Sequence, residues 1–207
     1  MTLQAARSAA VKGVLFDVGG VLVALDGMPA LAAMLGVGAT HEELHRLLMA
    51  APSVRDHESG RISARTFAEA VVRDLQLGAS PDEFLEVFMA WPTHVHPGAV
   101  ELVAEIPADY QVAILSNTNA AHWERITAMG LPQRFSQCYL SHEIGHLKPT
   151  NEAYLAALQG MDLQPEEVVF VDDGPGNVAA AQALGMNAHL VRNPQEARVV
   201  LERYRIV

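Results

Sequence analysis

Several features that mark specialised protein classes are scarce in this chain. Its 207 residues include one cysteine, Cys138, which excludes a disulfide within the chain and is typical of a reducing compartment. Lys and Arg are also few: 14 of them stand against 24 Asp and Glu, for a formal net charge of −10. Because nucleic-acid backbones are bound through clustered positive charge, we expect no nucleic-acid partner. The single cysteine leads us to expect a cytoplasmic protein.

Long apolar runs are absent as well. A helix that spans a bilayer needs about 18–20 consecutive apolar residues, and no stretch reaches that length, so we expect no membrane partner. Residues 1–10 lack an extended apolar core, which favours a lead-in to the first strand over a secretion signal. Half of the residues (50%) are hydrophobic, which excludes a disordered chain and fits one large domain or a domain with an insertion.

The sequence contains a regular alternation of short apolar runs and helical patterns. Strands are expected at 11–18, 111–117, 137–141, 168–173 and 187–191, and helices at 98–106, 120–129, 151–158 and 177–184. Near-continuous Val, Ile and Leu runs are typical of parallel strands that helices cover on both faces. The alternation predicts an α/β protein with a Rossmann-like, doubly wound parallel sheet.

Residues 25–96 interrupt this alternation with helical patterns alone. Three of the expected helix starts carry capping residues, namely Thr40 with Glu43, Ser80 with Glu83, and Ser63. We expect no strand here and interpret the segment as a small all-helical cap domain, inserted into a core made of residues 1–24 and 97–207. A cap inserted after the first strand would overhang the carboxyl ends of the strands, where α/β sheets bind ligands.

Polar residues follow four of the apolar runs at the point where each run stops. They are Asp17 after the first run, Ser116 and Asn117 after the second, Lys148 in the loop after the third, and Asp172 and Asp173 after the fourth. In a parallel sheet these ends meet at one edge, so the groups can converge. Converging carboxylates repel one another unless a hard cation such as Mg²⁺ lies between them. A carboxylate beside that ion can attack a phosphoryl group, so the set indicates phosphoryl transfer.

Four sequence motifs in order resemble those of the haloacid dehalogenase superfamily. They are FDVGGVL at 16–22, LSNTN at 115–119, LKPTNEAY at 147–154 and VFVDDGPGN at 169–177. The resemblance covers nearly the whole chain and includes a helical cap between motifs one and two. Within the superfamily the sequence resembles the small bacterial sugar-phosphate phosphatases, especially α-D-glucose-1-phosphate phosphatase, and the phosphatase domain of epoxide hydrolases.

The resemblance implies a role for each motif residue. Asp17 would be the nucleophile and a Mg²⁺ ligand, and Gly19 would offer its backbone carbonyl to the metal. Asp173 would be the main acidic ligand, and Asp172 a direct or water-mediated second one. The phosphoryl group would be held by Ser116, Asn117 and Lys148, with Lys148 orienting it against Asp17. Asn177 would lie in the outer shell of the metal.

One position departs from the family pattern. The family's phosphatases usually carry a second aspartate two residues after the nucleophile, as general acid and base, and here that residue is Gly19. We therefore expect a Mg²⁺-dependent phosphatase for a small phosphorylated metabolite, with a sugar phosphate favoured because an anomeric hydroxyl leaves more easily. A weak or vestigial phosphate-binding protein and a haloacid dehalogenase are the alternatives. A monomer or weak homodimer is expected.

Overall fold

The computed structural model describes residues 10–36, 38 and 40–207, so most of the expected lead-in at 1–10 lies outside the described residues. Five parallel strands form a sheet in the order β5-β4-β1-β6-β7. Their bounds are β1 Gly13–Phe16, β4 Gln111–Ser116, β5 Gln137–Leu140, β6 Val168–Asp172 and β7 Asn187–Leu190. Each strand lies inside a predicted run, and the predicted fold class is confirmed.

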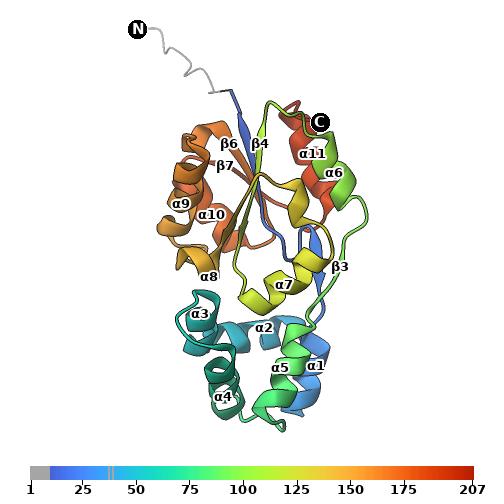
Figure 1. Cartoon of the computed structure of the whole chain (residues 1–207), viewed down its shortest axis with the longest axis vertical. Helices are drawn as coiled ribbons and strands as arrows, with labels where there is room; N and C mark the ends of the chain where they lie inside the picture. The colour runs from blue at the N-terminus through green and yellow to red at the C-terminus, as the bar shows by residue number, and fades with distance from the viewer. Residues whose placement is uncertain (1–9, 37, 39) are drawn as a thin grey trace.

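Helices cover both faces of this sheet (Figure 1). One face packs against α6 Ala99–Glu105, α7 Ala120–Ala128 and α11 Pro194–Arg203; the other packs against α9 Asn151–Met161 and α10 Pro175–Ala183. Along β1, Phe16 points to the first face and Leu15 to the second, and both side chains are fully buried. Burial on both faces explains why the strands read as continuous apolar runs. The sequence prediction missed α11 and the single turn α8 Ser141–Ile144.

A second group of helices lies beyond the carboxyl ends of the strands, at the bottom of Figure 1. It consists of α1 Met28–Leu35, α2 His41–Ala50, α3 Pro52–Glu58, α4 Ala64–Asp74 and α5 Pro81–Met89. These helices enclose their own apolar cluster, in which Phe67, Phe84 and Phe88 contact one another. The predicted caps are confirmed at Thr40, Ser63 and Ser80. Each side chain accepts a hydrogen bond from the backbone N–H three residues later in the chain.

The prediction that residues 25–96 contain no strand is wrong at both ends. β2 Val23–Leu25 and β3 Pro92–Val95 pair antiparallel where the chain leaves the core and returns to it. The two connections run side by side, so their backbone groups pair with each other, although each is too short to show a periodic pattern. The division at 24/25 and 96/97 stays a prediction. Within the described residues, no helix is long and apolar enough to cross a membrane.

The two leucines Leu15 and Leu155 allow a matched test of this packing. Leu15 is fully buried in β1, whereas Leu155 on α9 is 51% exposed. We expect Leu15→Ala to lower the free energy of unfolding by about 2–5 kcal/mol, because it leaves a cavity between the sheet and its helices. Leu155→Ala should change it by less than about 0.5 kcal/mol. Urea unfolding of both variants measures the difference, and equal losses would contradict the packing described here.

Candidate active site

The polar residues predicted at the strand ends do converge. β1 lies between β4 and β6, with Phe16 opposite Ile114 on one side and Val171 on the other. The next residues along these strands therefore meet at one edge of the sheet, and they include Asp17 and Asp172. Asp17, Ser116, Lys148 and Asp172 are all buried, with at most 7% of each residue exposed. Polar groups this deeply buried are stable only when they are paired.

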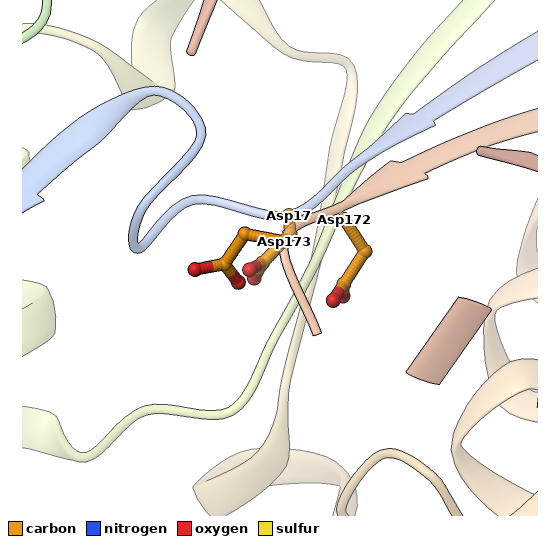
Figure 2. A group of neighbouring side chains, drawn as sticks. All are labelled: Asp17, Asp172 and Asp173. Atoms are coloured by element: carbon orange, nitrogen blue, oxygen red, sulfur yellow. The ribbon is translucent and has the colours of Figure 1, made fainter. Parts of the chain in front are cut away.

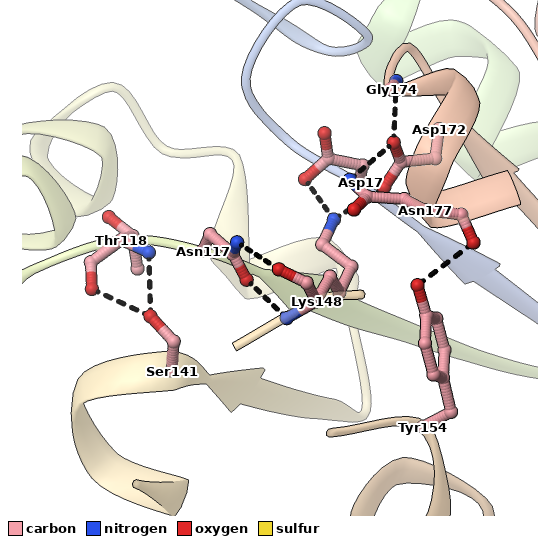
Figure 3. Close-up of polar contacts among 9 residues, drawn as sticks. All are labelled: Asp17, Asn117, Thr118, Ser141, Lys148, Tyr154, Asp172, Gly174 and Asn177. Atoms are coloured by element: carbon pink, nitrogen blue, oxygen red, sulfur yellow. Dashed lines mark hydrogen bonds and ion pairs between the residues drawn. The ribbon is translucent and has the colours of Figure 1, made fainter. Parts of the chain in front are cut away.

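Lys148 is the centre of the cluster (Figure 3). Its ammonium lies 2.8 Å from Asp17 Oδ1 and 2.6 Å from Asp172 Oδ2. The Asn117 side chain fixes the lysine's backbone: its Nδ2 donates to Lys148 O at 2.9 Å, and its Oδ1 accepts from Lys148 N at 2.8 Å. Burial alone would lower the pKa of Lys148, but the charges of Asp17 and Asp172 outweigh it and raise that pKa. The lysine is therefore held as a cation beside Asp17.

This arrangement gives Asn117 a clear structural role. Both ends of its amide group bind the Lys148 backbone. That Asn117 binds phosphate stays a prediction. Its side chain joins the loop after β4 to the loop that carries the lysine, and so sets the position of Lys148. Ser116, the last residue of β4, lies on the same edge and is 3% exposed.

The Asp172 carboxylate is also engaged on both oxygens. Oδ2 pairs with Lys148, and Oδ1 accepts from Gly174 N at 2.7 Å and from Asn177 Nδ2 at 2.9 Å. Asn177 is held in turn by Tyr154, whose hydroxyl donates to Asn177 O at 2.9 Å. Of the two arrangements predicted for Asp172, this favours a water-mediated contact with the metal, because protein donors already bind both oxygens.

The acidic groups suit a divalent cation. Asp17, Asp172 and Asp173 each place one carboxylate oxygen within 4.8 Å of the others (Figure 2). Lys148 supplies one positive charge against these three carboxylates, so the ionised cluster keeps an excess of two negative charges. Burial raises the pKa of Asp17 to about 7 against the opposing charge of Lys148, and burial followed by the charge of Asp172 raises the pKa of Asp173. Hard oxygen donors with excess negative charge fit Mg²⁺.

The two glycines after Asp17 have different reasons to be glycine. Gly20 has a φ of 75°, and a Cβ there would lie 2.2 Å from Asp173 Oδ2. A side chain at Gly20 would therefore displace one of the acidic residues. At Gly19 a Cβ would lie 2.7 Å from Leu25 Cδ1, so the position at which the family resemblance implies an acid faces a leucine from β2. The expected contact between the Gly19 carbonyl and a metal stays a prediction.

Ser141 is a buried polar residue that the sequence analysis did not identify. Its Oγ accepts from Thr118 N at 2.9 Å, and the same oxygen lies 2.6 Å from Glu58 O and 2.9 Å from Thr118 O. The hydroxyl thus joins the cap helix α3 to the loop after β4. In the sequence, Ser141 is the end of an apolar run, and a serine at that position does not indicate a partner 83 residues away in the chain.

Comparison with known proteins decides the family. The family model of haloacid dehalogenase-like hydrolases matches residues 11–185. The chain belongs to this family. D-ribitol-5-phosphate phosphatase from Bacteroides thetaiotaomicron is 25% identical to this haloacid dehalogenase-like hydrolase over 203 residues, covering 92% of this chain and 98% of its own. The family prediction is confirmed.

Solved structures of the haloacid dehalogenase-like family have the same fold. A HAD-like family hydrolase from Porphyromonas gingivalis has a TM-score of 0.76 at 25% identity, over 94% of this chain and 98% of that one. A HAD family enzyme from Bacteroides thetaiotaomicron, in complex with magnesium and inorganic phosphate, has a TM-score of 0.71 at 24% identity, over 87% and 93%.

The raised pKa of Asp17 predicts that Mg²⁺ binding by this hydrolase depends on pH. Because burial raises the pKa of Asp17 to about 7, we expect a cation to displace a proton from it below that pH, so that binding weakens by up to about tenfold per pH unit. Calorimetric titration at about pH 6 and about pH 8, in two buffers with different ionisation enthalpies, measures the affinity and the protons released. Asp17→Asn should weaken binding and reduce this dependence, leaving the part that Asp173 contributes. An affinity that is constant over this range would contradict the expectation.

Proposed function

We propose that the chain is a Mg²⁺-dependent phosphatase that hydrolyses a small phosphorylated metabolite, with a sugar phosphate favoured, through an aspartyl phosphate on Asp17. The observation that carries the proposal is the position of Asp17, buried after the end of β1, with the Lys148 ammonium at 2.8 Å and one carboxylate oxygen each of Asp172 and Asp173 within 4.8 Å. A carboxylate beside a fixed cation and a metal site is equipped to receive a phosphoryl group.

Each residue of the site has a separate role in the proposed reaction. The free oxygen of Asp17 attacks phosphorus, and Lys148 neutralises charge on the transferring oxygens without having to move, because Asp172 and the Asn117 amide hold it in place. The Ser116 hydroxyl binds a phosphoryl oxygen from the end of β4. Asp17 and Asp173 would hold Mg²⁺, which would neutralise part of the phosphate charge.

The family relatives support the choice of substrate class. The relative from Bacteroides thetaiotaomicron that spans nearly the whole chain is named for a phosphorylated sugar alcohol. A phosphatase also fits this chain's own charge: without a cation, the negative cluster at Asp17 would repel a phosphate dianion, so a metal and Lys148 are needed to make the site attractive to it.

Two alternatives make different demands on the site. The reaction of a haloacid dehalogenase does not require the excess negative charge that Asp172 and Asp173 add beside Asp17. A vestigial phosphate-binding protein would keep the geometry without turnover. Assays for chloride release from a 2-haloacid and for phosphate release from sugar phosphates separate the three functions.

Asp17→Asn tests the proposed nucleophile. With Mg²⁺ present, we expect the wild-type chain to release inorganic phosphate from members of a sugar-phosphate panel, and the variant to lose at least about 10³-fold in kcat/KM because an amide cannot form the acyl phosphate. Asp109→Asn, at an exposed turn, is the matched control and should retain full activity.

Two results would count against the phosphatase. Wild-type protein that binds phosphate but releases none from any member of the panel supports the vestigial alternative. Activity that survives Asp17→Asn within about tenfold excludes this residue as nucleophile.

A further inference from the structure

We propose that Glu58, at the end of cap helix α3, is the general acid and base that acts on the leaving-group oxygen, the task for which Gly19 has no side chain. This inference rests on the proposed phosphatase function. It identifies a catalytic residue in the cap, outside the four motifs that carry the rest of the chemistry.

The loop after Asp17 cannot supply this proton. Gly19 offers no acid, and the space next to its Cα is taken by Leu25, whose Cδ1 lies 2.7 Å from the place of a Cβ. Leu25 belongs to β2, the strand that leads into the cap, and its side chain cannot transfer a proton. An alkoxide that leaves without a proton is a poor leaving group, so acid catalysis must come from elsewhere or be lost at a cost of about 10²–10⁴-fold.

The cap places Glu58 against the core at the site. Glu58 is the last residue of α3, and its backbone oxygen lies 2.6 Å from Ser141 Oγ, which also accepts from Thr118 N in the loop after β4. Two residues later Gly60, with a φ of 73°, packs so closely on α8 that a Cβ would lie 2.4 Å from His142 O. These contacts hold the end of α3 against the loop that follows Ser116.

The surroundings of Glu58 give its carboxyl the properties of a proton carrier. The residue is half-buried, and burial raises the pKa of its carboxyl to about 7, while the positive charges of Lys148 and Arg55 oppose the rise. Lys148, whose charge acts on the Glu58 carboxyl, is the same residue whose ammonium pairs with Asp17. Further titratable residues of these two helices are Asp56 and His57 on α3 and His142 and Glu143 on α8. A group with a pKa near neutrality is efficient both as an acid and as a base.

The proposed reaction balances in two steps. Asp17 carboxylate attacks phosphorus and the P–O bond to the leaving group breaks, while protonated Glu58 gives its proton to the departing oxygen and becomes a carboxylate. The released product is a neutral alcohol. Glu58 carboxylate then takes a proton from water, whose oxygen attacks the aspartyl phosphate; the bond to Asp17 breaks, inorganic phosphate leaves, and Glu58 is protonated again.

Glu58→Gln, compared between two kinds of substrate, tests this role. We expect the variant to lose about 10²-fold or more in kcat/KM for a sugar phosphate, whose alkoxide needs a proton. With p-nitrophenyl phosphate, whose phenolate leaves without one, kcat/KM should change by less than about threefold. Glu86→Gln, an exposed glutamate of the cap helix α5, is the matched control and should leave both substrates unaffected.

The pH dependence is a second readout, which a purely structural role of Glu58 would not change. Because Glu58 must be protonated to donate, the wild-type ratio of kcat/KM for the sugar phosphate to that for p-nitrophenyl phosphate should fall as pH rises through about 7. In Glu58→Gln the ratio should be low and independent of pH. In Gly19→Asp/Leu25→Ala/Glu58→Gln, an acid at the position used by relatives should restore the sugar-phosphate rate at least in part.

The outcomes separate this inference from the proposed function. If the wild-type chain releases no phosphate from either substrate, the phosphatase itself is wrong. If the wild type is active and Glu58→Gln loses equal factors on both substrates, or loses nothing on the sugar phosphate, the assignment of Glu58 is overturned while the phosphatase stands.

Discussion

The Lys148 ammonium, buried between Asp17 and Asp172, is the interaction on which the site depends. Removing one partner from a buried ion pair costs about 3–5 kcal/mol, because an uncompensated charge is left behind. Each partner is therefore held by further contacts: Asn117 fixes the lysine's backbone, and Gly174 and Asn177 fix Asp172. The anchoring contacts thus fall on Lys148 and Asp172, beside the proposed nucleophile Asp17.

The same constraint is the reason that we propose a cap residue for the acid step. The core edge is crowded: Gly20 must be glycine to admit Asp173, and Leu25 fills the space beside Gly19. A side chain at Gly19 would require the Leu25 side chain to move. The cap helix α3 is joined to the core through Ser141, and we propose that the residue at its end approaches the substrate without disturbing the ion pairs.

The sequence predicted the sheet strands well because burial on both faces gives β1, β4 and β6 continuous apolar runs. It failed at β2 and β3, where a few residues pair only because the two connections to the cap lie side by side. It also identified Asp17, Lys148, Asp172 and Asp173 as a converging set, since residues at the ends of neighbouring parallel strands must meet.

The sequence by itself thus determined the fold class, the inserted cap, the family and the residues that gather at the sheet edge, because all of these depend on local patterns and strand order. The tertiary structure decided how those residues pair: that Asn117 holds Lys148, that Asp172 is engaged on both oxygens, and that Glu58 is brought to the core by Ser141. Such contacts join segments that are remote in the chain, and a side chain's partner depends on packing that no local pattern records.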